Sequence, residues 1–309
     1  MLRKIRVIIS VVLFALITFY FLDFADILPN SFHRLAHIQF VPAFLSLSLG
    51  ILVFLIVLTL IFGRIYCSSI CPMGIFQDMV AWISKVTSKK KKRYSYSPAK
   101  NILRWSIVGI ATLATLMGFT FILALLDPYS AYGRIVTNVF KPVYMSGNNL
   151  LESVFSRFEN YTFYQVDVAI LSVASFVIAL VTFCIIFYLA WKHGRTWCNT
   201  ICPVGTLLGF VGRFSIFKVR IDFERCNGCG QCATKCKAVC INSKEHAIDY
   251  SRCVDCFDCL EACNKHALVF APSLSSLRRQ EKSDASKRRF LVAGAMAATT
   301  LPKALAQVK

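Results

Sequence analysis

Eight cysteines in the last third of the sequence fall into two runs with identical spacing. The runs are Cys226-x2-Cys229-x2-Cys232-x3-Cys236 and Cys253-x2-Cys256-x2-Cys259-x3-Cys263. Bacterial ferredoxins with two cubane clusters share this spacing: three cysteines of a run bind one cluster and the fourth binds the other. The sequence therefore predicts two [4Fe–4S] clusters, one on Cys226, Cys229, Cys232 and Cys263, and one on Cys253, Cys256, Cys259 and Cys236.

Two features distinguish these runs from the usual pattern. The proline that commonly follows the fourth cysteine is replaced by Lys237 and Asn264, and an extra thiol, Cys240, follows the first run. A pair of structural zinc sites would also use four thiolates each, but zinc ribbons combine two C-x2-C knuckles rather than a doubled run of four. We therefore predict clusters rather than zinc, and a packed thiol at Cys240.

A second set of cysteines lies in an internal repeat. Residues 63–74 and 194–205 both read G-R-x-aromatic-C-x-x-I-C-P-x-G. Cysteines four apart share one face of a helix, so Cys67 and Cys71 of the first copy can converge with Cys198 and Cys202 of the second. These four thiols either bind a further metal ion or cluster, act as redox-active thiols, or shape the junction with the cluster-binding segment.

The chain that positions these cysteines is rich in apolar residues. Of its 309 residues, 56% are hydrophobic, above the roughly 45–50% of soluble domains. Four apolar segments reach or approach the length of about 20 residues that crosses a bilayer: 7–22, 43–62, 105–126 and 168–191. The repeated motif follows the second and fourth segments. We therefore predict an all-α four-helix transmembrane core, a duplicated two-helix unit, joined to a small α+β ferredoxin-like domain.

The positive charge of the chain indicates how it would sit in a membrane. The net charge of +19 is concentrated beside the apolar segments, which fits membrane flanks rather than a groove for nucleic acid. Lys and Arg are frequent at 3–6 and 85–93 but sparse in 23–42 and 127–165. The positive-inside rule then predicts a multi-pass protein of the bacterial inner membrane, with the N-terminus and the ferredoxin-like domain in the cytoplasm.

These features divide the chain into four parts. Residues 1–104 and 105–217 are the two helix pairs with their motifs, 218–272 is the cluster-binding domain, and 273–309 is a basic tail. In the tail, Lys287-Arg288-Arg289 precedes an apolar stretch, which approximates a twin-arginine export signal. We interpret the tail either as a signal-like relic or as an amphipathic segment that touches the membrane.

The doubled C-x3-C-P motif followed by a two-cluster domain resembles the NapH/NosR/CcoG-type membrane polyferredoxins over roughly residues 1–270. NapH-like members act as quinol dehydrogenases, NosR-like members support nitrous oxide reduction, and CcoG-like members reduce copper for oxidase assembly. The resemblance implies an electron-transfer protein whose partners are the lipid bilayer, a quinone or quinol and a redox protein. The alternatives are a copper-reducing assembly factor and a non-catalytic redox sensor or scaffold.

Two groups of polar residues are candidates for quinone or metal chemistry. Asp127-Pro128-Tyr129-Ser130, with Arg134, resembles a feature that family members place at the outer end of the third helix. Asp127 would accept a quinol proton and Arg134 would bind a quinone oxygen; otherwise they form an ordinary turn and interfacial anchor. His33 and His37 are either proton acceptors, metal ligands or solvated interfacial histidines.

Overall fold

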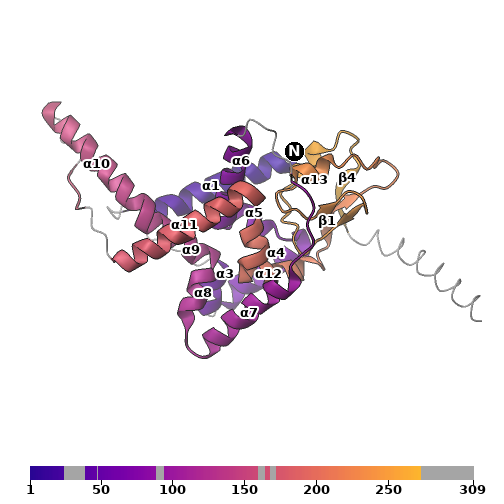
Figure 1. The fold of residues 1–309 in the computed structure, drawn as a ribbon, viewed down its shortest axis with the longest axis horizontal. Helices are drawn as coiled ribbons and strands as arrows, with labels where there is room; N and C mark the ends of the chain where they lie inside the picture. Colours follow the sequence, from indigo (N-terminus) through magenta and orange to yellow (C-terminus); the bar gives the residue numbers. More distant parts are fainter. Residues whose placement is uncertain (24–38, 47, 88–93, 159–163, 168–171, 273–309) are drawn as a thin grey trace, which may run out of the picture.

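A computed structural model describes residues 1–23, 39–46, 48–87, 94–158, 164–167 and 172–272 (Figure 1). His33, His37, the lysine run 88–93 and the predicted tail lie outside the described residues. The described chain is mostly helical, with a small domain at its C-terminal end that contains the strands. Figure 1 shows this domain at one end of the molecule and the long helices extending away from it.

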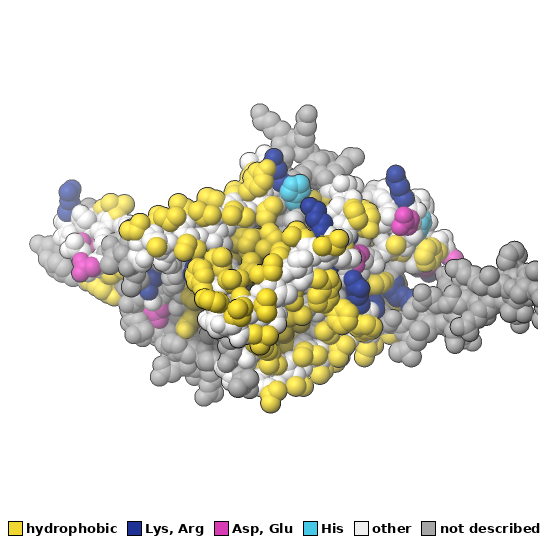
Figure 2. Space-filling view, turned by 60° about the horizontal axis from the view of Figure 1, so that its bottom comes forward, with side chains coloured by type: hydrophobic (Ala, Val, Ile, Leu, Met, Phe, Trp, Pro, Cys, Tyr) yellow, Lys and Arg dark blue, Asp and Glu magenta, His cyan; other side chains and the backbone are white. Residues whose placement is uncertain are grey.

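Among the described residues, two helices are long and apolar enough to cross a bilayer: α1 (Leu2–Leu22) and α11 (Val173–His193). They correspond to the first and fourth predicted segments. Three further apolar helices are shorter, namely α4 (Leu49–Phe62), α7 (Asn101–Leu116) and α12 (Pro203–Gly212). The apolar side chains of α1, α4, α7 and α11 are extensively exposed. Figure 2 shows a broad hydrophobic face on the molecule. A surface of this kind is suited to lipid or to a partner.

The second and third predicted segments are each broken in two, so the expectation of continuous helices there is wrong. The helix α3 (Phe40–Leu45) ends before α4, where the Ser46 hydroxyl donates to the Ala43 carbonyl and contacts the Ser48 hydroxyl. Such side-chain bonds compete with the helical pattern. The helix α7 ends before Gly118, whose φ of 88° is left-handed, and α8 (Thr120–Leu126) then packs back against α7. Glycine commonly ends helices in this way.

The predicted loop 127–165 is largely helical. It contains α9 (Pro128–Ile135), the π-helical turn η2 (Val136–Phe140), α10 (Lys141–Phe155) and the 3-10 turn η3 (Ser156–Phe158). The Asp127 carboxylate caps α9 by accepting from the Ser130 backbone N–H, and Pro128 occupies the first turn, where its missing N–H costs nothing. Both α9 and η2 pack against α11, and η2 also contacts α1.

The last helix of each repeat packs against a helix of the other repeat. In the first repeat, α5 (Ile65–Ser69) leads into α6 (Pro72–Thr87), which packs chiefly against α11 of the second repeat. In the second repeat, the π-helical turn η4 (Trp197–Ile201) leads into α12, which packs against α4 of the first repeat and against α7. This crossed packing brings the two motifs together at the centre of the molecule.

The C-terminal domain is built from two two-stranded antiparallel sheets and two short helices. Strand β1 (Phe217–Ile221) pairs antiparallel with β4 (Leu268–Pro272), and β2 (Ile241–Asn242) pairs with β3 (Ala247–Ile248). The helices α13 (Gln231–Lys235) and α14 (Asp258–Ala262) pack against each other. Each helix begins within one cysteine run, so the fold holds the two runs side by side.

Candidate functional site

A buried arginine of each repeat binds the cysteine loop of the other repeat. The Arg64 guanidinium donates to the Cys198 carbonyl at 3.3 Å, and the Arg195 guanidinium donates to the Cys67 carbonyl at 2.7 Å. Both arginines are fully buried. The identical sequence motifs therefore produce a reciprocal contact, in which each arginine supports the loop that carries the other copy's first cysteine.

The same two motifs dock the C-terminal domain. Each begins with a glycine in the left-handed region, Gly63 with φ 72° and Gly194 with φ 69°. The next backbone N–H then points at the domain: that of Arg64 donates to the Asp255 carboxylate, and that of Arg195 donates to the Lys237 carbonyl, both at 3.0 Å. The cluster-binding segment is thus held against the helical core at two equivalent positions.

A buried carboxylate, Asp78 of α6, joins three parts of the molecule. It accepts from Arg195 through both oxygens at 2.7 Å, and it pairs with Arg6 of α1 at 3.1 Å and with Lys237 of the C-terminal domain at 3.6 Å. Burial alone would raise the pKa of Asp78, but the charges of Arg195, Lys237 and Arg6 outweigh it and hold this pKa well below its usual range. Asp78 is therefore ionised and central to the assembly.

The N-terminus lies against the C-terminal domain (Figure 1). Arg3 pairs with Asp258 at 2.9 Å and also with Glu261, both of α14. Lys237 pairs with the same Asp258 at 3.0 Å. The basic start of α1 and the cluster-binding segment are therefore neighbours in the fold.

The eight cysteines of the two runs line two cavities. Cys226, Cys229, Cys232 and Cys263 line the first, together with Gly228, Gly230 and His246. Cys236, Cys253, Cys256 and Cys259 line the second, together with Cys240. The fourth cysteine of each run thus lies with the first three of the other run. The Cys240 sulfur is 3.6 Å from that of Cys236, so the extra thiol is buried beside this second group.

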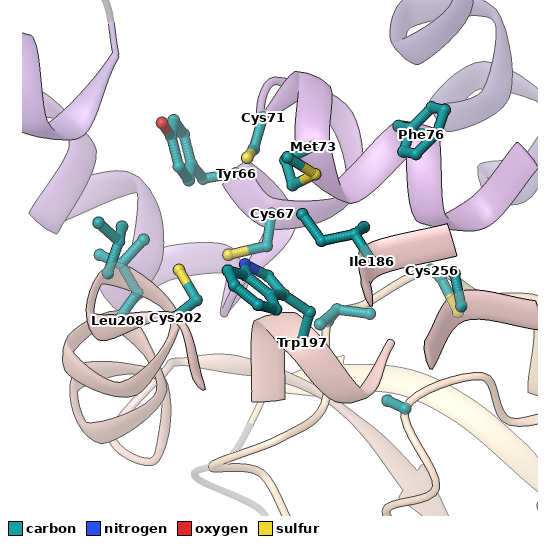
Figure 3. Close-up of a cluster of buried hydrophobic side chains, with 14 of the residues drawn as sticks. Tyr66, Cys67, Cys71, Met73, Phe76, Ile186, Trp197, Cys202, Leu208 and Cys256 are labelled. Carbon is teal, nitrogen blue, oxygen red and sulfur yellow. The ribbon is translucent and has the colours of Figure 1, made fainter. Parts of the chain in front are cut away.

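The four repeat cysteines are also brought together. Cys67, Cys71, Cys198 and Cys202 are each at most 5% exposed. Figure 3 shows Cys67, Cys71 and Cys202 in one buried group with Trp197, Tyr66 and Leu208. Burial raises the pKa of Cys198 to about 11, although Arg195 and Arg64 act in the opposite direction. The neutral Cys198 thiol is therefore disfavoured as a nucleophile, while a bound metal would hold it as a thiolate.

An apolar cavity adjoins this group. Its volume is about 270 Å³, and its walls come from α3, α7, α8 and the start of α12, including Phe40, Thr112, Leu123 and Val204. Val204 follows Cys202 by two residues, and the backbone N–H of Phe40 donates to the hydroxyl of Tyr66, next to Cys67. The cavity thus meets the buried cysteines on one side and the exposed apolar face on the other.

The structure separates the roles expected for Asp127 and Arg134. Asp127 is 1% exposed; its Oδ2 accepts from the Ser130 N–H and hydroxyl, both at 2.8 Å, and its Oδ1 has no partner among the described residues. Arg134 donates to the Leu125 carbonyl at 3.2 Å and so clasps the end of α8. Asp127 is therefore a buried helix cap, and quinone binding by Asp127 and Arg134 stays a prediction.

Several important side chains carried no recognisable signal in the sequence. Asp78 stands alone in an apolar helix, and its partners lie 72, 117 and 159 residues away along the chain. Gln77 of the same helix donates to the Cys198 sulfur at 3.1 Å. Arg64 and Arg195 occupy identical positions in the two copies of the motif, so the repeat did indicate them. Only the packing shows that each arginine binds the cysteine loop of the other copy.

Comparison with known proteins gives one family match and several relatives. A family model described as a 4Fe-4S binding domain matches residues 45–93 and 175–222, which are the two repeats. The matched ranges contain Cys67, Cys71, Cys198 and Cys202 but none of the eight cysteines of the later runs. No solved structure is significantly similar to the chain.

The relatives are named as ferredoxin-type or electron-transport proteins. A methylamine utilization ferredoxin-type protein, MauN, of Paracoccus denitrificans is 26% identical over 57% of this chain and 49% of its own length. The putative electron transport protein YccM of Escherichia coli is 28% identical over 63% and 47%, and the ferredoxin-type protein NapH of the same organism is 24% identical over 63% and 54%. The chain spans about half the length of these relatives. By its repeated motif, its family match and these relatives, the chain is similar to the ferredoxin-type proteins named NapH and MauN.

Proposed function

We propose that this protein is a membrane-bound iron–sulfur carrier that exchanges electrons between the quinone pool, or a cytoplasmic donor, and a redox partner protein. The observation that carries the proposal is the grouping of the eight run cysteines around two adjacent cavities, on a domain docked against apolar helices. Paired clusters accept electrons singly, which suits stepwise exchange with a two-electron carrier such as quinol. The names of the relatives, ferredoxin-type and electron transport, support the same class of function.

The donor sets fit two [4Fe–4S] clusters. In this proposal Cys226, Cys229, Cys232 and Cys263 hold one cluster, and Cys253, Cys256, Cys259 and Cys236 hold the other. The left-handed turns at Gly228 and Gly230 recur at Asp255 and Phe257 of the second run, so both loops curl around their cavities in the same way. The clusters would supply one-electron redox chemistry, and the chain supplies the thiolates and the burial that set their potentials.

Exchanging the fourth ligand tests this arrangement. We expect the Cys263→Ala variant to lose the first cluster, and with it about four irons per chain, while the EPR signal of the second cluster is kept. Cys236→Ala should do the converse, unless Cys240 at 3.6 Å replaces the lost ligand. Iron analysis and EPR of the reduced protein measure both. Loss of the cluster that belongs to a variant's own run would contradict the crossed assignment.

The apolar cavity beside Cys202 is our candidate for the quinone site. Its volume of about 270 Å³ is close to the lower limit of small-molecule sites, and it opens between helices that expose apolar side chains. The end of α8, which contributes Leu123 to the wall, leads within a turn to the buried Asp127. In this proposal Asp127 accepts a quinol proton through its unpartnered oxygen, and Arg134 fixes the α8 end rather than binding the quinone.

Filling the cavity mouth tests the quinone site. Protein reduced with dithionite and freed of excess reductant should be reoxidised rapidly by a menaquinone analogue. We expect Thr112→Trp, at an exposed part of the cavity wall, to slow this reoxidation by about tenfold or more. Leu113→Trp is the matched control, since Leu113 is 61% exposed and is not in the wall. Equal rates in the two variants would remove the cavity from the proposal.

The same assay separates quinone exchange from copper reduction. Cupric ion is added to a second portion of the reduced protein, and cluster absorbance is followed. Rapid reoxidation by copper with a slow quinone response would replace the proposed function with metal assembly, and a response to neither would favour a sensor or scaffold.

A further inference from the structure

The four repeat cysteines lie in a site that is built to hold negatively charged sulfur. Each sulfur has an N–H donor close to it: Arg64 for Cys67 at 3.9 Å, Gln77 for Cys198 at 3.1 Å, and the Gly205 backbone for Cys202 at 3.3 Å. The backbone N–H of Gly74 likewise donates a hydrogen bond to the Cys71 sulfur, as that of Gly205 does to Cys202. Donors directed at every sulfur are typical of thiolates bound to a metal centre.

A buried positive charge at this site lacks an acidic partner. Arg64 is 0% exposed, and its guanidinium donates to Asn199, to the carbonyls of Ser251 and Cys198, and towards the Cys67 sulfur. Among the described residues no carboxylate forms an ion pair with it; Asp255 binds its backbone N–H instead. Arg195 differs, because Asp78 neutralises it. A buried guanidinium without a counter-charge is costly, and metal-bound thiolates would supply the missing negative charge.

A second buried donor is also left without an acceptor. Trp197 is 7% exposed, and its indole Nε1 has no partner among the described residues. Figure 3 shows the indole nitrogen directed towards the Cys67 sulfur, inside the group of repeat cysteines. Buried indole N–H groups usually find an acceptor. The sulfur atoms of a bound centre would provide one here.

Two equivalent positions of the site, Gly74 and Gly205, have no room for a side chain. A Cβ built on Gly74 would collide with the Cys67 carbonyl oxygen, and one built on Gly205 would collide with that of Cys198. Each C-x3-C loop is therefore folded tightly against the start of its following helix. This curvature turns both cysteines of a loop into the interface between the repeats.

We propose that Cys67, Cys71, Cys198 and Cys202 together bind a third iron–sulfur cubane, held across the interface of the two repeats. A single zinc ion would require four sulfurs about 2.3 Å from one point, and no three ligand side chains among the described residues converge in this way. A cubane instead takes its four thiolates at separate corners. The centre would lie between the apolar cavity and the docked domain, beside Arg64, which contacts both repeats and Ser251 of that domain.

The first test is the metal content of the unaltered full chain, purified anaerobically in detergent. We expect about twelve iron and twelve sulfide per chain, and three reducible centres by EPR spin count and Mössbauer spectroscopy. This count does not depend on quinone exchange, so failure of either idea is visible separately. About eight iron with four thiols free to react, one bound zinc, or disulfides between the repeat cysteines would each overturn the third cubane.

The second test removes the ligands. We expect the quadruple variant Cys67→Ser, Cys71→Ser, Cys198→Ser and Cys202→Ser to retain about eight iron and the signals of the two other clusters. Those remaining signals report that the chain is folded. Cys184→Ser is the matched control, because Cys184 is an exposed thiol of α11 outside the site, and it should keep about twelve. An unchanged iron content in the quadruple variant would exclude these cysteines as ligands.

Discussion

Replacing Asp78 with asparagine is expected to lower the free energy of unfolding by about 3–5 kcal/mol. The substitution keeps the shape of the side chain but removes the negative charge that pairs with Arg195, Arg6 and Lys237 together. The Arg195 guanidinium, which is fully buried, would then lie in the interior without a counter-ion. Because Asp78 joins α1, the second repeat and the C-terminal domain, the substitution would weaken the packing of all three parts.

The measurement is thermal or denaturant unfolding of the detergent-solubilised protein, followed by circular dichroism and by cluster absorbance. Asp222→Asn is the matched control, since Asp222 pairs with the exposed Arg225 at 3.5 Å. An exposed pair of this kind is worth less than about 1 kcal/mol. A similar change in both variants would show that the Asp78 pairs stabilise the fold no more than an ordinary surface pair does.

Gly205→Ala is expected to destabilise the protein by about 1–3 kcal/mol and to disrupt the repeat cysteine site. The added methyl group would meet the Cys198 carbonyl oxygen, which is backbone, and would also crowd the Arg64 guanidinium, 2.9 Å away. Neither neighbour can move without loosening the reciprocal contact between the repeats. Gly74→Ala should behave alike, because it meets the Cys67 carbonyl oxygen in the same manner.

Gly109 provides the control for this prediction. It lies inside α7, and a Cβ there would meet no atom within 4 Å. Gly109→Ala should therefore leave stability unchanged or improve it by up to about 1 kcal/mol, since alanine favours a helix over glycine. Unfolding midpoints and iron content of the three variants decide the matter. If Gly205→Ala matched Gly109→Ala in both readouts, the tight folding of the C-x3-C loops would not be needed.

The parts of this fold that the sequence predicted well are those specified over short distances. The spacing of the cysteine runs fixes their local loops, and the identical lettering at 63–74 and 194–205 identifies the repeat. The hydrophobic length of residues 2–22 and 173–193 is sufficient to indicate α1 and α11.

Other parts of the fold were predicted wrongly or not at all, because a long apolar run hid a local signal or because the contacts form only in the fold. Gly118 is an ordinary helix-ending signal, yet the apolar run around it suggested one continuous helix. Asp127-Pro128 is an ordinary helix-starting signal, but it was interpreted as a turn or a quinone site. Asp78, by contrast, could not have been interpreted without the fold. Its role depends on Arg6 of α1, Arg195 of the second repeat and Lys237 of the C-terminal domain, and nothing within its own helix distinguishes it from a solvated carboxylate.

The crossed arginines also constrain how the protein is made. Arg64 and the Cys198 carbonyl that it binds are 134 residues apart, which at translation speeds of about 5–20 residues per second corresponds to roughly 7–27 s. During that interval the first repeat has been synthesised but lacks Arg195, which binds the Cys67 carbonyl, and the packing of α11 against α6. The loop that carries Cys67 and Cys71 therefore lacks its contact with Arg195 until the second repeat has been synthesised.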